Sequence, residues 1–497
     1  MRLTKLNRLI NTPILQGGMG VGVSGWELAR AVAKRGQAGI VSGTGMALVI
    51  PKLLQEGDKD GSIRLAKEAF PIPELGQLVW DRYYKEGGIE QNKQHKSIPM
   101  PDHEPRELMR ALLVFSSFAA VYLAKVGHDG LVGINFLEKL QAPHLFETYG
   151  AMLAGVDFII VGAGLGSQFP KMIDNLYRSV TASYKIDVAS GDGYPADKYE
   201  MTFDPKTVIS PKDFQKLEVE KPLCLFIVST ALAARVLIRQ TKELPPDGFV
   251  VEGPKAGGHN ASPRGAFALN ERGEPIYNLE GDDSPGYDII RGLGLPFWIA
   301  GESCSPEALQ RALDLGACGV QIGTAFSFCR ESGILLEIKQ RSVRDCLDGN
   351  YDVYTSVNAS PTGYPFKIVM REGTLWDLTV YNGRNRICDI GYLREAYWKK
   401  DKNGDQAIGW RCSSEPIDDY LNKGGQIEKT VGSVCVCNGL MATIGLGQYR
   451  EKERRREPQL ITSGDVVKFV VLLKDKLGSD GLWGAGDVID LVLGIAA

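Results

Sequence analysis

The sequence predicts an α/β fold of the (β/α)₈ TIM-barrel type, with two insertions and a carboxy-terminal extension. Three observations support this prediction. Short, nearly continuous apolar runs recur along the chain, as in parallel strands that are covered on both faces. Glycine-bearing turns and helical patterns follow many of these runs, which is the order of a parallel α/β sheet. The chain contains eight such runs, and eight βα units close into a barrel.

The predicted strands lie, in order, at residues 13–16, 38–42, 131–136, 156–161, 223–228, 248–252, 296–300 and 318–322. Apolar residues at spacings of three and four predict helices at 25–35, 143–154, 230–241 and 306–315. We expect Ser24 and Ser305 to cap the first and the last of these helices. The apolar window 111–124 is too short to span a bilayer and contains two serines, so it predicts a buried helix.

The spacing of the strands predicts the domain organisation. Residues 1–330 form the barrel, with insertions at about 50–125 and 171–221, where the gaps between strands are longest and rich in Pro, Gly, Lys and Asp. We expect both insertions near the mouth of the barrel. Residues 331–497 are too many for one closing helix, so they form an extension packed on the barrel.

Composition excludes several classes of protein. The 497 residues are 44% hydrophobic and 24% charged, which is ordinary for a soluble globular protein. A net charge of −3 indicates neither nucleic acid nor a membrane surface as a partner. The amino terminus lacks the apolar core of a signal peptide. The odd count of nine cysteines then predicts reduced thiols and a cytoplasmic location.

Glycines follow nearly every predicted strand, at the end of the barrel where function resides. The turns after strands seven and eight place Gly301, Gly323 and Thr324 where this architecture often binds phosphate, through backbone N–H groups and one hydroxyl. The segment GVGVSG resembles a dinucleotide fingerprint. It is not read as one, because no acidic residue follows the second strand to bind a ribose.

The segment VVEGPKAGGHN, residues 250–260, places His259 directly behind Gly257 and Gly258 at the end of strand six. A lone histidine is more often structural than catalytic. Its place in the predicted mouth, near the predicted phosphate site, favours a role as a general base. His128 precedes strand three, at the opposite end of the barrel, and is interpreted as structural.

The cysteines raise two further hypotheses. Four of them could bind a metal, although the extension contains no CxxC pair and buried free thiols are the favoured interpretation. These four are Cys388, Cys412, Cys435 and Cys437. Cys304 lies beside the predicted phosphate loop, but no basic group near it in sequence would activate it as a nucleophile.

Several motifs together resemble the nitronate monooxygenase (2-nitropropane dioxygenase-like) family, in particular its longer bacterial branch. In chain order they are TPILQGGMGVGVSGWELA, AKVGHDGLVGINFLEKLQ, DFIIVGAGL, VVEGPKAGGHN, LPFWIAGES, GACGVQIGTAFSFC and SPTGYPFK, followed in the extension by RICDIGYLR, WRCSSEP and CVCNGLMATIGLGQ. The resemblance runs through nearly the whole chain. It implies a TIM-barrel flavoprotein that binds FMN without covalent attachment.

The resemblance also implies roles for single residues. It places the flavin ring against Gly18 and Met19, with Asn135 and Glu252 facing the cofactor and Gly258 in the turn beside it. It places the phosphate on Gly301, Gly323 and Thr324, with Ser229 contributing, and it makes His259 the catalytic residue. One departure is Glu302, which stands where the family usually has a second glycine and which would repel a phosphate unless it turned away.

The implied reaction is oxidation of an alkyl nitronate by O₂ to a carbonyl compound and nitrite. His259 would be the base towards a neutral nitroalkane, or would steer an anionic nitronate when protonated. The expected partners are a small-molecule substrate and O₂, and a homo-oligomer is left open. Two alternatives remain: an FMN-dependent NAD(P)H reductase of enoyl-thioesters or quinones on the same barrel, and a scaffold subunit with a vestigial flavin site.

Overall fold

A computed structural model describes residues 2–265 and 267–495. Eight parallel strands form one sheet in the order β1-β10-β9-β8-β7-β4-β3-β2. A parallel bridge between Leu15 and Ala38 joins its two outer strands, so the sheet is a nearly closed barrel. The barrel strands are β1 (Ile14–Gln16), β2 (Gly39–Ser42), β3 (Val132–Leu137), β4 (Phe158–Gly162), β7 (Leu223–Val228), β8 (Gly248–Glu252), β9 (Phe297–Ala300) and β10 (Gly319–Ile322).

All eight predicted barrel strands are confirmed, each within two residues at both ends. The four predicted helices are also found, as α2 (Trp26–Lys34), α7 (His144–Leu153), α10 (Ala231–Gln240) and α12 (Pro306–Asp314). Ser305 caps α12 as expected, because its hydroxyl accepts the Ala308 N–H at 3.2 Å. Ser24 does not cap α2, since Gly25 is the N-cap and the Ser24 hydroxyl bonds to the preceding loop instead.

The apolar window 111–124 lies in helix α6 (Glu107–Lys125), which packs against α2, α3 (Met46–Gln55), α5 (Pro73–Tyr83) and α7. The prediction of a buried helix is confirmed, but the argument from length was wrong. Among the described residues α6 is the one helix that is long and apolar enough to cross a membrane, and 78% of its most apolar window is buried inside the protein. Burial by neighbouring helices therefore accounts for its composition.

Neither insertion lines the cavity at the mouth, although both contact the extension that covers it. The first forms α3, α4 (Ser62–Ala69) and α5 on the outside of α6, and the second follows α8 (Phe169–Tyr177) with β5 (Ala182–Ala189), β6 (Asp197–Phe203) and α9 (Pro211–Lys216). Of the described residues, none in 49–134 or 164–226 lines the large cavity at the mouth. Strand β5 instead pairs with β13 of the extension, in a separate sheet of order β14-β13-β5-β6.

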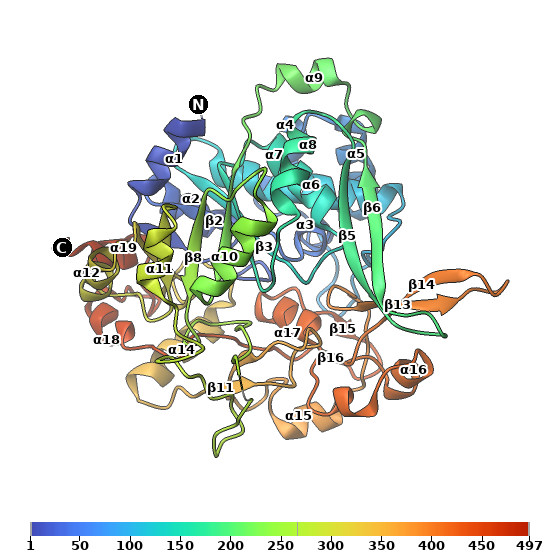
Figure 1. Ribbon diagram of the computed structural model, residues 1–497. Coiled ribbons are helices and arrows are strands. Elements are labelled where there is room, and N and C mark those ends of the chain that lie inside the picture. Colours follow the sequence, from blue (N-terminus) through green and yellow to red (C-terminus); the bar gives the residue numbers. More distant parts are fainter. Residues whose placement is uncertain (1, 266, 496–497) are drawn as a thin grey trace.

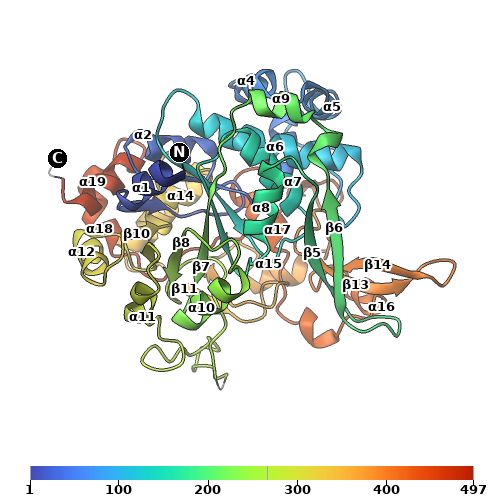
Figure 2. The same ribbon diagram turned by 45° about the horizontal axis from the view of Figure 1, so that its top comes forward.

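The extension covers the carboxyl ends of the barrel strands (Figures 1 and 2). Its elements are α14 (Leu336–Leu347), β11 (Val353–Ser356), β12 (Phe366–Val369), α15 (Leu378–Gly383), β13 (Glu395–Lys400), β14 (Gln406–Arg411), α16 (Ile417–Asn422), α17 (Val436–Thr443), β15 (Tyr449–Arg450), β16 (Arg455–Arg456), α18 (Phe469–Leu473) and α19 (Ala485–Leu493). The remaining helices are α1 (Arg2–Ile10), α11 (Tyr287–Gly292) and α13 (Thr324–Ser327).

The last helix of the extension completes the outer ring of the barrel. Strand β10 lies between β9 and β1, and the helices that follow β9 and β1 are α12 and α2. Helix α19 packs against both of these helices, and Arg35 beside α2 pairs with Asp490 of α19. The final helix of the chain therefore occupies the position of the eighth barrel helix.

Candidate active site

A cavity of about 720 Å³ lies at the carboxyl ends of the barrel strands, under the extension. This volume is typical of a small-molecule or cofactor site, where mostly apolar walls carry a few polar groups. Nine of the ten residues predicted to form the site line it: Gly18, Met19, Asn135, Glu252, Gly258, His259, Gly301, Gly323 and Thr324. Ser229, the tenth, is absent from its lining.

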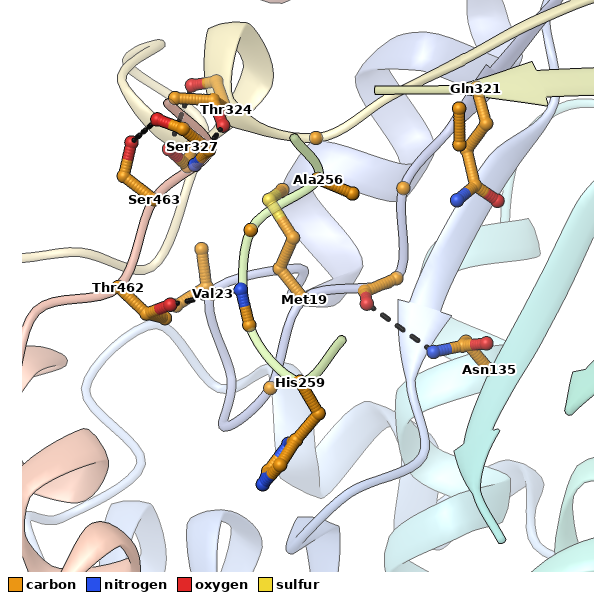
Figure 3. Close-up of a pocket in the computed structure, with 18 of the residues that line it drawn as sticks. Met19, Val23, Asn135, Ala256, His259, Gln321, Thr324, Ser327, Thr462 and Ser463 are labelled. Carbon is orange, nitrogen blue, oxygen red and sulfur yellow. Dashed lines mark hydrogen bonds between the residues drawn. The ribbon is translucent and has the colours of Figure 1, made fainter. Parts of the chain in front are cut away.

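The glycine loop after β1 is held in place by Ser24. The Ser24 hydroxyl accepts the Met19 N–H at 2.9 Å and donates to the Gly17 carbonyl at 2.9 Å. The loop then passes close to Asn135, whose Nδ2 donates to the Gly18 carbonyl at 3.3 Å (Figure 3). A Cβ on Gly18 would lie 2.2 Å from the Asn135 Cβ, so only glycine fits at this position.

Asn135 has an unused acceptor. Its Oδ1 is buried and has no hydrogen-bond partner among the described residues. Buried polar atoms almost always have a partner, so an orphaned acceptor in a cavity indicates a ligand with a donor group at this point. The N–H of a flavin ring is such a donor, and the Asn135 position therefore fits the cofactor that the sequence predicts.

His259 faces the cavity from the loop after β8 (Figure 3). Its Nε2 lies 2.7 Å from the Ser360 Oγ, and its ring lies 4.6 Å from the ring of Phe366. His259 is half-buried in the wall of the cavity, and this burial lowers the pKa of its imidazole to about 4. His259 is therefore neutral near pH 7, which suits a proton acceptor and not a fixed positive charge.

Ser360 was missed as a site residue by sequence reasoning. It lies 101 residues after His259, is buried, and its Oγ is 2.9 Å from the Thr362 Oγ1. A serine hydroxyl can donate or accept, so the two hydroxyls orient the imidazole and set its tautomer. The one available signal was its position in the motif SPTGYPFK.

Glu252 ends β8 inside the cavity. Burial raises the pKa of its carboxyl group to about 8. The group is therefore largely protonated near neutral pH and can donate a hydrogen bond to a ligand.

The turns after β9 and β10 form the other end of the cavity. Gly301 has a φ of 90°, which only glycine adopts easily. The Thr324 Oγ1 accepts the Gly464 N–H at 2.9 Å and can still donate its own hydrogen (Figure 3). Backbone N–H groups of two glycine turns and a hydroxyl form a donor set that fits a phosphate.

Glu302 takes up a glycine-like conformation, with a φ of 54°. A positive φ is easiest for glycine, which agrees with the expectation that Glu302 takes the place of the second glycine in the family pattern. Its carboxylate pairs with the Lys255 ammonium at 2.5 Å, and both side chains are partly exposed. The Glu302 carboxylate, whose negative charge would repel a phosphate, is therefore paired with the Lys255 ammonium. Lys255 is a second site residue that sequence reasoning missed.

Among the described residues, no group of three or more His, Cys, Asp or Glu side chains is placed to hold a metal ion. The four candidate cysteines are free thiols, and Cys437 lines the cavity. Burial raises the pKa of Cys304 to about 12, which agrees with its dismissal as a nucleophile.

The roof of the cavity comes from the extension. The Gly258 N–H donates to the Thr462 Oγ1 at 3.0 Å, and the His259 backbone forms a bridge with Phe366 (Figure 3). The loop that carries His259 is therefore fixed by residues more than a hundred positions away.

Part of the chain is similar to known proteins. The family model of nitronate monooxygenase matches residues 172–361, which contain β7 to β10, His259 and Ser360. The chain is 33% identical over 139 residues to a protein of Bacillus subtilis (strain 168) named probable nitronate monooxygenase. That match covers 28% of this chain and about a third, 36%, of the relative.

Three solved structures share low identity with the chain. FabK from Thermotoga maritima has a TM-score of 0.46 at 15% identity, covering 99% of this chain and 94% of FabK. A nitroalkane oxidase from Streptomyces ansochromogenes has a TM-score of 0.41 at 14% sequence identity, and the match covers 98% of this chain and 96% of that protein. The enoyl reductase domain of MlnA from Bacillus amyloliquefaciens has a TM-score of 0.46 at 10% sequence identity, and the match covers 99% of this chain and 97% of that domain. The sequence matches therefore show that residues 172–361 of this chain are similar to the nitronate monooxygenase family.

Proposed function

We propose that the protein is an FMN-dependent enzyme that oxidises alkyl nitronates with O₂ to a carbonyl compound and nitrite. The observation that carries the proposal is the neutral imidazole of His259, held by Ser360 in the same cavity as the Gly18–Asn135 contact and the two glycine turns. The match of residues 172–361 to the nitronate monooxygenase family model supports FMN as the cofactor. A small-molecule substrate, O₂ as co-substrate and a cytoplasmic location remain part of the proposal.

The cavity supports one orientation of FMN. The phosphate would lie at Gly301, Gly323 and Thr324, and the ring would lie against Gly18 and Met19. The Asn135 Oδ1 would accept an N–H of the ring, and the protonated Glu252 would donate to one of its acceptors. When bound, FMN supplies the electron transfer and the oxygen chemistry.

His259 is proposed as the general base towards neutral nitroalkanes. A pKa of about 4 leaves the imidazole unprotonated at neutral pH, so it can accept the proton from the substrate α-carbon. The same pKa argues against the alternative role, in which a protonated His259 would steer an anionic nitronate. Ser360 would hold the ring through Nε2 and leave Nδ1 to face the substrate.

Two experiments test the proposal. Purified protein should be yellow and should release FMN on denaturation, and a colourless protein that takes up no FMN would refute a flavoenzyme. Mixed anaerobically, ethylnitronate should reduce the flavin, whereas NADH or NADPH should leave it oxidised. Rapid bleaching by a pyridine nucleotide, without bleaching by the nitronate, would assign the reductase alternative instead.

A further inference from the structure

The two ends of the cavity differ in charge. The charged side chains of its lining come from the loops after β8 and β9, from α12 and from the segment before α18: Glu252, Lys255, Glu302, Glu307, Arg311 and Lys468. The opposite part of the lining, which we call the apolar arm, contains no charged side chain. It consists of Leu48, Phe136, Leu137, Leu140, Ile390, Tyr392, Leu393, Val436, Cys437 and Leu440.

The barrel places these two parts across the mouth from each other. In the closed order of the eight strands, β3 stands four positions from β9 and is therefore diametrically opposite to it. Gly301 and Glu302 follow β9, whereas Asn135 and Phe136 belong to β3. The apolar arm thus begins beside Asn135 and extends away from the end that fits the phosphate.

Helix α17 of the extension forms one wall of the apolar arm. Val436, Cys437, Leu440 and Thr443 line the cavity, and their spacing places them along one face of the helix. The other wall consists of Phe136 and Leu137 at the end of β3 and of Leu140 in the loop that follows. Burial raises the pKa of the Cys437 thiol, so this side chain also stays uncharged.

We propose that the apolar arm binds an unbranched alkyl tail of the substrate, whose reacting carbon lies between Asn135 and His259. This inference rests on the proposed function, because it assigns the substrate class of the same site. A nitronate of two or three carbons would leave the arm unfilled. A longer tail would place its own apolar surface in the arm and out of water, which favours binding by an amount proportional to its length.

A series of unbranched 1-nitroalkanes from two to ten carbons, supplied as nitronates, tests the inference through kcat/KM. Burial of one methylene stabilises a complex by about 0.8 kcal/mol, which is about a fourfold rise per added carbon. We expect such a rise until the arm is filled, followed by a plateau. Equal kcat/KM for all chain lengths would overturn the inference.

Variants that narrow the apolar arm should reduce the length of alkyl tail that the arm can bind. Leu440→Phe and Val436→Phe should each move the plateau to shorter chains, and two separate sites guard against a folding defect in either one. Leu309→Phe is the matched control, because Leu309 is as buried as Leu440 at 9% exposure but lies on α12 outside the cavity. A changed chain-length profile in the control alone would refute the assignment of the arm.

Binding without turnover separates this inference from the proposed function. Calorimetric titration of the purified protein with unbranched alkanoates of four to twelve carbons should give affinities that rise with length in the wild type. The rise should end at shorter chains in Leu440→Phe. Such a result in a protein that oxidises no nitronate would support the apolar arm and refute the reaction. If the protein oxidises nitronates, but neither kcat/KM nor the affinity for alkanoates depends on chain length, the proposed reaction would be supported and the apolar arm refuted.

Discussion

At the scale of single residues, His259 and Glu252 show how burial sets chemistry in this cavity. Glu252 ends β8 and His259 lies in the loop that follows, yet burial shifts their pKa values in opposite directions, down to about 4 for the imidazole and up to about 8 for the carboxyl. Both shifts favour the neutral form. Near pH 7 the site therefore contains one neutral base and one neutral acid.

Replacement of His259 by Ala should separate two substrates. Turnover of a neutral nitroalkane should fall by about 10²–10⁴-fold, the usual contribution of a general base, whereas turnover of the preformed nitronate should fall much less. The ratio of the two kcat/KM values measures this difference. His128→Ala is the control, because His128 bonds to the Ala124 carbonyl and the Gly130 N–H away from the cavity. An unchanged ratio in His259→Ala would remove the assigned role.

Replacement of Glu252 by Gln should alter stability in a pH-dependent way. Between pH 4.5 and about 8 the folded protein keeps the proton of Glu252 while the unfolded chain has lost it, so the wild type loses stability as the pH rises. The loss approaches about 1.4 kcal/mol per pH unit. Glu252→Gln cannot ionise and lacks this loss.

The Tm of Glu252→Gln minus the Tm of the wild type should therefore increase from pH 5 to pH 8. Above pH 8 this difference in Tm should level off. All other titrating groups cancel in this comparison. A difference in Tm that is constant from pH 5 to pH 9 would show that Glu252 is ionised in the folded protein.

At the scale of elements, the glycine loop after β1 and strand β3 are joined by one close contact. Replacement of Gly18 by Ala should destabilise the protein by about 1–3 kcal/mol, since the added Cβ would overlap the Asn135 Cβ and one of the two elements must shift. FMN affinity should fall as well, because both residues are expected to contact the ring. Urea unfolding and titration with FMN measure the two effects.

Gly253→Ala is the matched control for Gly18→Ala. A Cβ on Gly253 meets nothing within 4 Å, although the residue directly follows Glu252 at the end of β8. This variant should change both quantities little. Equal losses in the two variants would mean that the close approach of Gly18 to Asn135 has no special part in the site.

The elements of the barrel could be predicted because their signals are local. An apolar run followed by a glycine turn is visible in any short window, and all eight strands were found in this way. Ser24 shows the limit of this reasoning. It has the sequence position of an N-cap, but its hydroxyl forms bonds with Gly17 and Met19, and a local pattern cannot rank these partners.

The contacts that complete the site could not be predicted, because they join distant parts of the chain. Ser360 lies 101 residues from His259, and Thr462 lies 204 residues from Gly258. Neither residue has a periodicity or a spacing that marks it. The insertions were expected near the mouth, and only long-range packing decides that they contact the extension there while the extension itself lines the cavity.

At the scale of the whole molecule, the extension and the barrel depend on each other. Strand β13 of the extension pairs with β5 of the second insertion, and α19 takes the eighth helix position. Trp483 lies just before α19, is fully buried, and donates from Nε1 to the Ala325 carbonyl at 3.0 Å. Its ring also meets Phe469 edge-on at 6.0 Å. Ala325 and Phe469 both line the cavity.

Replacement of Trp483 by Ala should therefore weaken the site and the fold together. We expect a loss of about 3–5 kcal/mol, typical of a buried aromatic side chain, in one urea transition that includes both barrel and extension. FMN affinity should fall in parallel. Trp80→Ala is the control, because Trp80 stacks on Tyr84 at 4.2 Å in the first insertion, away from the cavity, and should lower stability without changing FMN affinity. Two separate transitions in Trp483→Ala, with the barrel transition unchanged, would instead show that the barrel folds without the helix that completes its ring.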